Sequence, residues 1–101
     1  MAQYLDKAAC RKTLTALMPR LKREFGVSSL GLFGSYVRDE QTPESDIDLL
    51  VTFGSAPSLI RFLALEQLLS ETLGAKVDLV MRSALKPHIG EAILAELEQI
   101  A

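Results

Sequence analysis

The sequence SDIDLLVTF, residues 45 to 53, decides how the rest of the chain is interpreted. Its last seven residues, Ile47 to Phe53, are mostly aliphatic and have the length of one strand, so they predict a buried strand. Residues two apart in a strand point to the same face. We therefore expect Asp46 and Asp48 to project together from one face of a sheet. The other face would carry three apolar side chains into a core, namely Ile47, Leu49 and Val51.

Two carboxylates this close repel each other unless they are open to solvent, share a proton or bind a cation. A hard divalent ion, with Mg²⁺ the natural candidate, takes carboxylate oxygens and keeps open positions for phosphate. A D-x-D pair by itself is more often a surface strand entry, with Asp46 in a turn. Both interpretations stay open on the pair alone.

A third aspartate lies in the next predicted strand. Residues 58 to 73 place leucines and a phenylalanine on one helical face before Gly74, and KVDLVM, residues 76 to 81, predicts a strand. A strand, helix, strand connection of this length makes the two strands parallel neighbours. Asp78 would then share one edge of the sheet with Asp46 and Asp48, beside a metal, or would occupy the solvent face of an edge strand.

The remaining elements are weaker predictions. Leu14 to Phe25 has apolar residues at helical spacing up to Gly26, and although Pro19 interrupts the pattern we expect one bent helix. Ser29 to Phe33 predicts a strand, and the polar residues 35 to 45 a helical turn and a loop. A last helix after Pro87 is predicted by the spacing of four apolar residues, Ile89, Ile93, Leu97 and Ile100.

The first strand runs directly into Gly34-Ser35. A glycine at a strand end allows the backbone to approach a ligand closely, and the amides of Ser35 and Tyr36 would point outward as an anion site. The alternative is an ordinary strand-to-helix turn. The sequence lacks the better-known phosphate motifs, G-x-x-x-x-G-K-[ST] and G-x-G-x-x-G.

Length and composition limit the number of domains and the class of fold. The 101 residues, 49% hydrophobic and 24% charged with a net charge of -2, are expected to form one domain over residues 1–101. We expect an α/β fold of order α-β-α-β-α-β-α, with a three-stranded or slightly larger mixed sheet packed on helices. No apolar run has the length of a membrane span, and the single Cys10 cannot form an internal disulfide, so a cytoplasmic location is expected.

Charge is unevenly distributed. Residues 1 to 25 hold six basic and two acidic side chains. Because no aromatic residues interleave with these charges, we interpret them as a solvated helix face and expect no direct nucleic-acid binding.

Taken together, these motifs resemble the DNA polymerase β-like nucleotidyltransferase superfamily. The resemblance rests on Gly34-Ser35, Arg38, Ser45-Asp46-Ile47-Asp48-Leu49 and Asp78. Among its members the chain resembles the stand-alone minimal nucleotidyltransferase (MNT) proteins, from about Leu14 to about Ile93. Such proteins are typically antitoxins paired with a helical HEPN-domain toxin, so the resemblance implies a hetero-oligomer with that toxin.

The resemblance also implies a reaction, the transfer of AMP from ATP to a tyrosine of the toxin with release of pyrophosphate. It implies that Asp46 and Asp48 hold two Mg²⁺ ions and that Asp78 completes the metal site or takes the tyrosine proton. The implied nucleotide-binding residues are Gly34, Ser35, Arg38 and Ser45. Two alternatives are an antitoxin that only masks the toxin and a nucleotidyltransferase acting on a small molecule.

The sequence departs from the family pattern after the glycine loop, because Arg38 is followed by Asp39 where glycine is usual. Arg38 contacts a phosphate or forms a structural clamp with Asp39, Glu40 or Glu44. The single histidine, His88, is expected to face solvent.

Overall fold

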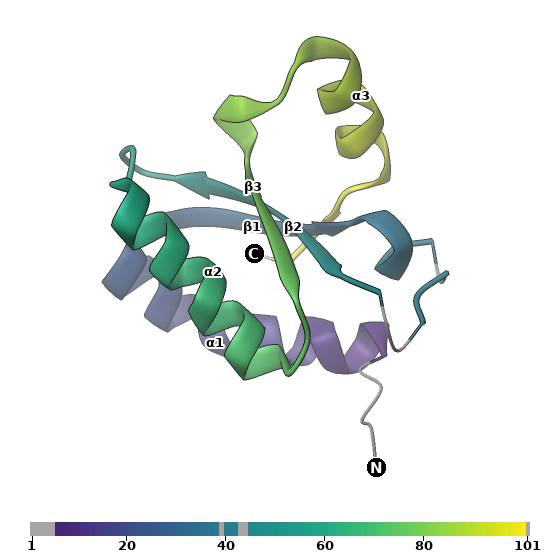
Figure 1. The fold of residues 1–101 in the computed structure, drawn as a ribbon, viewed down its shortest axis with the longest axis horizontal. Helices are drawn as coiled ribbons and strands as arrows, with labels where there is room; N and C mark the ends of the chain where they lie inside the picture. Colours follow the sequence, from purple (N-terminus) through teal and green to yellow (C-terminus); the bar gives the residue numbers. More distant parts are fainter. Residues whose placement is uncertain (1–5, 39, 43–44, 101) are drawn as a thin grey trace.

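The computed structural model describes residues 6–38, 40–42 and 45–100 of the chain. Its helices are α1 (Lys7–Phe25), α2 (Leu59–Leu73) and α3 (Pro87–Glu96), with short 3-10 turns η1 (Gly34–Tyr36) and η2 (Arg82–Ala84). The strands are β1 (Val27–Phe33), β2 (Ile47–Phe53), β3 (Val77–Met81) and β4 (Glu98–Gln99). The sheet order is β3-β2-β1-β4 (Figure 1). This confirms the predicted α/β fold with a mixed sheet, which has β4 in addition to the three predicted strands.

Helix α1 is continuous through Pro19, as the sequence predicted. The side chain of Asp6 accepts a hydrogen bond of 2.7 Å from the amide of Ala9 and so caps the helix start. Gly26 ends the helix with a φ of 70°, a left-handed conformation that glycine adopts at little cost.

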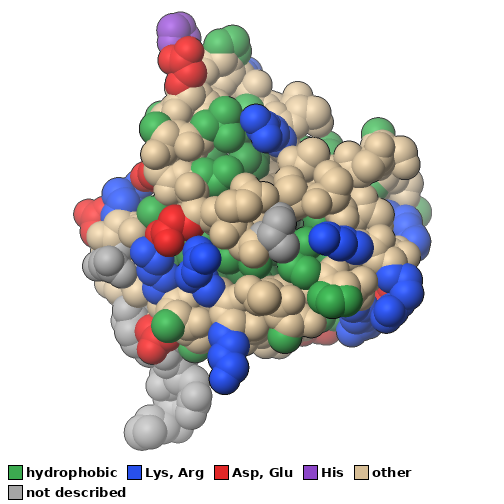
Figure 2. All heavy atoms as spheres, turned by 180° about the vertical axis from the view of Figure 1, so that it is seen from behind, with side chains coloured by type: hydrophobic (Ala, Val, Ile, Leu, Met, Phe, Trp, Pro, Cys, Tyr) green, Lys and Arg blue, Asp and Glu red, His purple; other side chains and the backbone are tan. Residues whose placement is uncertain are grey.

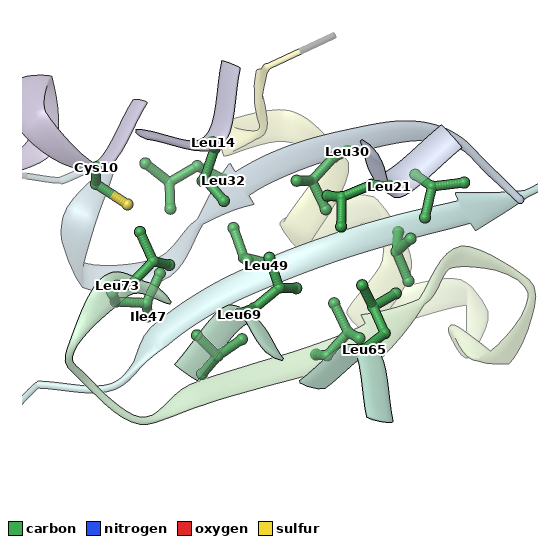
Figure 3. Close-up of a cluster of buried hydrophobic side chains, with 14 of the residues drawn as sticks. Cys10, Leu14, Leu21, Leu30, Leu32, Ile47, Leu49, Leu65, Leu69 and Leu73 are labelled. Carbon is green, nitrogen blue, oxygen red and sulfur yellow. The ribbon is translucent and has the colours of Figure 1, made fainter. Parts of the chain in front are cut away.

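Helices α1 and α2 lie side by side over one face of the sheet, and the core fills the space between the layers (Figures 1 and 3). The predicted inward residues of β2 are all in this core. Burying each such leucine or isoleucine contributes about 1.5 to 3 kcal/mol. The core residues with no exposed surface are Cys10, Leu14, Leu21, Leu30, Leu32, Ile47, Leu49, Val51, Leu65 and Leu69.

Strand β3 pairs with β2 in parallel, as the strand, helix, strand connection predicted, and it forms one edge of the sheet. Side chains of α2 cover part of that edge. The hydroxyl of Ser70 accepts a hydrogen bond of 3.1 Å from the amide of Val77, and Oε2 of Glu66 accepts one of 3.2 Å from the amide of Leu79. These contacts satisfy strand donors that would otherwise be open to another chain.

The C-terminal prediction was wrong in one respect. The single helix expected to run to Ile100 ends at Glu96, and the chain turns at Leu97 into β4, which pairs with β1 in antiparallel fashion. Leu97 packs directly on Gly31, where an added Cβ would lie 2.5 Å from Cδ1 of Leu97. Because of this contact Leu97 is not part of the helix, although its spacing from Ile93 fits one.

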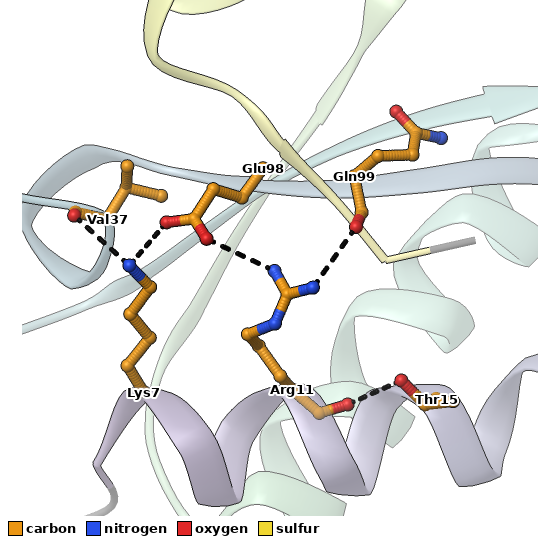
Figure 4. Close-up of polar contacts among 6 residues, drawn as sticks. All are labelled: Lys7, Arg11, Thr15, Val37, Glu98 and Gln99. Carbon is orange, nitrogen blue, oxygen red and sulfur yellow. Dashed lines mark hydrogen bonds and ion pairs between the residues drawn. The ribbon is translucent and has the colours of Figure 1, made fainter.

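Two basic side chains of α1 hold β4 in place (Figure 4). Nζ of Lys7 lies 2.5 Å from Oε2 of Glu98, and the guanidinium of Arg11 lies 3.4 Å from Oε1 of the same residue. Part of the basic character of the first 25 residues is therefore used inside the fold. Figure 2 shows Lys and Arg side chains scattered over the rear face rather than gathered in one patch, which fits the solvated-face interpretation.

None of the helices in the described ranges is both long and apolar enough to cross a membrane.

Candidate active site

Two of the three predicted aspartates, Asp48 and Asp78, lie side by side at one end of the sheet, and Asp46 immediately precedes β2. Asp48 stands in register with Asp78 on the parallel neighbour β3 and with Phe33 on the antiparallel neighbour β1. Since Ile47 and Leu49 face the core, Asp48 faces the opposite side, and its registered partner Asp78 shares that face. The predicted placement of Asp78 beside Asp48 is confirmed.

Asp48 is the most perturbed of these carboxyl groups. Its partial burial, followed by the negative charges of Asp78 and Asp46, raises its pKa to about 6. The nearby Arg38 guanidinium acts in the opposite direction. A carboxyl group held at this pKa between two others is a place where a cation is favoured, because a positive charge would relieve the repulsion.

Asp46 and Asp78 are both exposed. The two alternatives for Asp78, a place beside the other acids and a place on the solvent face of an edge strand, are therefore compatible. Asp78 lies on the solvent face of an edge strand and also beside Asp48. Asp46 immediately precedes β2, with its Oδ2 atom 3.8 Å from Nζ of Lys76. Because Asp78 is exposed, its burial gives no reason for a metal partner, and its place beside Asp48 is the observation that bears on one.

Gly34 brings the backbone against Asp48. Its φ is +78°, and a Cβ added to it would lie 2.9 Å from Cγ of Asp48 and closer still to Oδ2. Glycine is therefore required here for its conformation and for the close approach, as expected of a glycine at this strand end. The approach places the Gly34-Ser35 backbone beside the acidic residues.

Ser35 and Ser45 belong to the two segments that adjoin the acids, the turn after β1 and the turn before β2. Ser35 lies within the 3-10 turn η1, which agrees with the helical turn predicted at this point, and its carbonyl accepts a 2.9 Å hydrogen bond from the amide of Glu40. The hydroxyl of Ser45 accepts a 2.8 Å hydrogen bond from the amide of Thr42. Ser45 therefore shapes the turn that leads into β2, and its role toward a nucleotide stays a prediction.

Arg38 binds acidic side chains, as in the structural clamp that was one of the two roles predicted for it. Nε lies 2.5 Å from Oε1 of Glu40, and NH1 lies 2.8 Å from Oε2 of Glu96. These hydrogen bonds, that to Glu40 first, raise the pKa of the already basic guanidinium. The other partners proposed for this clamp, Asp39 and Glu44, lie outside the described residues.

Glu96 is the site residue that the sequence did not indicate. Its Oε1 atom accepts a 3.0 Å hydrogen bond from the amide of Gly34, 62 positions away in the chain. A glutamate at the end of an amphipathic helix has no distinctive pattern, and its contact depends on the turn at Leu97. Only the tertiary structure could have found it.

The residues at this end fit Mg²⁺ in their chemistry, because carboxylate oxygens are the ligands that this ion prefers in proteins. The pairing of Asp48 with Asp78 in register on neighbouring strands is the observation that supports such an ion. Within the described ranges, no three His, Cys, Asp or Glu side chains already converge as a metal-binding group. The three-carboxylate metal site stays a prediction.

Three other residues that could carry chemistry lie outside the candidate active site. His88 is exposed, as expected, and Tyr36 is buried in the core. Burial raises the pKa of the Cys10 thiol to about 11, so it is a packing residue.

A small α/β domain with paired aspartates beside a glycine turn defines the class, a nucleotidyltransferase. The chain belongs to the nucleotidyltransferase domain family, whose model matches residues 14–99. It is 49% identical over 84 residues to the protein adenylyltransferase MntA of Thermococcus cleftensis, an alignment that covers 83% of this chain and 85% of that protein.

Solved structures with a similar fold agree with this family. A structure described as a proposed minimal nucleotidyltransferase matches with a TM-score of 0.83 and 31% identity, covering 95% of this chain and 97% of that chain. A crystal structure of a toxin-antitoxin with AMP-PNP matches with a TM-score of 0.73 and 26% identity, covering 86% of this chain and 72% of that one. The resemblance drawn from the motifs is confirmed.

Proposed function

We propose that this nucleotidyltransferase is an antitoxin that transfers AMP from ATP to a tyrosine of a HEPN-domain toxin and so inactivates it. The observation that carries the proposal is the pairing of Asp48 with Asp78 beside Gly34, since it combines carboxylates with a backbone that can approach phosphate. Two similarities support it: 49% identity to a protein adenylyltransferase, and the fold of a toxin-antitoxin with AMP-PNP.

In this reaction the phenolic oxygen of the tyrosine attacks the α-phosphorus of ATP. A bond forms between that oxygen and the phosphorus, the bond from the α-phosphorus to the bridging oxygen breaks, and pyrophosphate leaves. We assign Asp78, which is exposed on the edge strand β3, as the group that would accept the phenolic proton. It is also available as a third metal ligand beside Asp48.

Asp46 and Asp48 are the residues that would hold Mg²⁺ at this end of the sheet. When bound, the metal would neutralise phosphate charge and favour in-line displacement. The chain's own contribution is to position the phosphates. The Gly34 amide and the Arg38 guanidinium supply hydrogen-bond donors, and Gly34 has no side chain to block their approach.

Mass spectrometry of the toxin after incubation with the protein, ATP and Mg²⁺ tests the proposal. The toxin should gain the mass of AMP with the native protein and lose that gain with Asp48→Asn. Glu91→Gln, which removes one charge from an exposed position on α3, is the matched control and should modify the toxin normally. Equal toxin masses with native protein and Asp48→Asn would show that these acids do not carry out transfer.

A second candidate function, neutralisation by binding alone, is favoured by one observation. Three large aliphatic side chains near the start of α2 are unusually open: Leu59 at 72%, Ile60 at 80% and Leu63 at 51% exposure. Such a surface is typical of a contact with a protein partner. If masking suffices, Asp48→Asn should still inhibit the toxin without ATP, whereas Ile60→Lys should release it. If transfer is required, Asp48→Asn should fail to inhibit.

A further inference from the structure

Glu96 bridges the two groups that the proposed function assigns to phosphate. One carboxylate oxygen, Oε1, accepts a hydrogen bond of 3.0 Å from the Gly34 amide, and the other, Oε2, accepts one of 2.8 Å from NH1 of Arg38. The Glu96 side chain is only 26% exposed, so it lies within the site rather than over it. A carboxylate therefore occupies the place between an amide donor and a guanidinium.

An anion in this place excludes a second one. The Gly34 amide has a single hydrogen to donate, and Glu96 uses it. A phosphate oxygen that takes the same hydrogen must displace the carboxylate. If the carboxylate stayed, two negative groups would lie within contact distance in a partly buried site, which is strongly unfavourable.

The backbone around Glu96 is held independently of this contact. Leu97 packs on Gly31, Glu98 binds Lys7 and Arg11, and the amide of Ile100 donates a 2.8 Å hydrogen bond to the carbonyl of Leu30. These contacts keep the chain in place on both β1 and α1. A rotation of the Glu96 side chain can therefore vacate the site without unfolding the C-terminal segment.

We propose that Glu96 occupies the position of a nucleotide phosphate in the ligand-free protein, and that a bound nucleotide displaces it from Gly34 and Arg38. Glu96 thereby lowers the affinity for the nucleotide and prevents weakly binding anions from occupying the site. This inference rests on the nucleotide site of the proposed function, but it concerns binding rather than transfer.

Isothermal titration with inorganic pyrophosphate, and separately with ATP, in the presence of Mg²⁺ tests the inference. Glu96→Gln keeps the size of the side chain and removes its charge. Because hydrogen bonds to charged groups are about twice as strong as neutral ones, we expect Glu96→Gln to bind pyrophosphate about threefold to tenfold more tightly than the native protein. Glu91→Gln, with the same charge change on the exposed side of α3, should bind as the native protein does.

Equal or weaker pyrophosphate binding by Glu96→Gln would overturn the inference, and so would a native protein and variant that both fail to bind it. A second measurement needs no variant. In an NMR titration of the native protein with pyrophosphate, the Gly34 amide and the Glu96 side-chain carboxyl signals should move together. Movement of the amide alone would contradict displacement. A protein that shows these binding effects but modifies no toxin would refute the proposed function and leave this inference intact.

Discussion

Gly34 and Asp48 pack so closely that a Cβ on Gly34 would lie 2.9 Å from Cγ of Asp48. Gly34 immediately follows β1 and Asp48 lies near the start of β2, and these two strands are antiparallel neighbours. The position of the carboxylate and the path of the glycine turn are therefore set together, and neither can change alone.

Gly34→Ala should abolish transfer and destabilise the fold by about 1 to 3 kcal/mol, because it adds a clash with Asp48 to a left-handed backbone. Activity assays and urea denaturation measure the two effects. Gly74→Ala is the matched control. Gly74 has a φ of +68° but open space around its Cβ position, so the variant should lose about 1 kcal/mol and keep its activity. Similar activity in both variants would contradict the importance of the contact.

The pKa of Asp48 predicts how the ligand-free protein responds to pH. The carboxyl group has a pKa of about 6 in the fold against its ordinary value of 3.8, so the folded state binds the proton more tightly than the unfolded chain. The free energy of unfolding should therefore fall as pH rises from about 4 to about 6 and should change little from this group above that range. Urea denaturation of native protein and Asp48→Asn across this range measures the difference. A native curve parallel to that of Asp48→Asn would contradict the shift.

Cys10 should react very slowly with iodoacetamide in the native protein. Its thiol has no exposed surface, and burial raises its pKa to about 11 from the ordinary value of 9.0, which leaves about a hundredfold less thiolate near neutral pH. Labelling followed by mass spectrometry should show rapid modification only in urea. Rapid labelling of the native protein would mean that α1 opens locally.

The sequence predicted the acidic half of the site better than the half near Glu96. Ile47 to Phe53 is a strand with the predicted bounds, and the helical crossover correctly placed Asp78 beside Asp48. Both predictions used local periodicity and connection rules, which depend on neighbouring residues. The Glu96 contact with Gly34 and the strand β4 depend instead on Leu97 packing against Gly31, a long-range contact with no local pattern.

That long-range contact leads to the last prediction. In Gly31→Ala the new methyl group would lie 2.5 Å from Cδ1 and 2.8 Å from Cγ of Leu97, so Leu97 must move, and we expect the C-terminal segment to shift away from β1 with it. We expect a loss of about 1 to 3 kcal/mol in urea denaturation, as for other overpacked sites. Gly54→Ala, whose nearest atom would lie 3.8 Å away, should change stability far less. If the shift carries Glu96 from the Gly34 amide, Gly31→Ala should also bind pyrophosphate more tightly. Unchanged stability would show that Leu97 rotates aside without moving the chain.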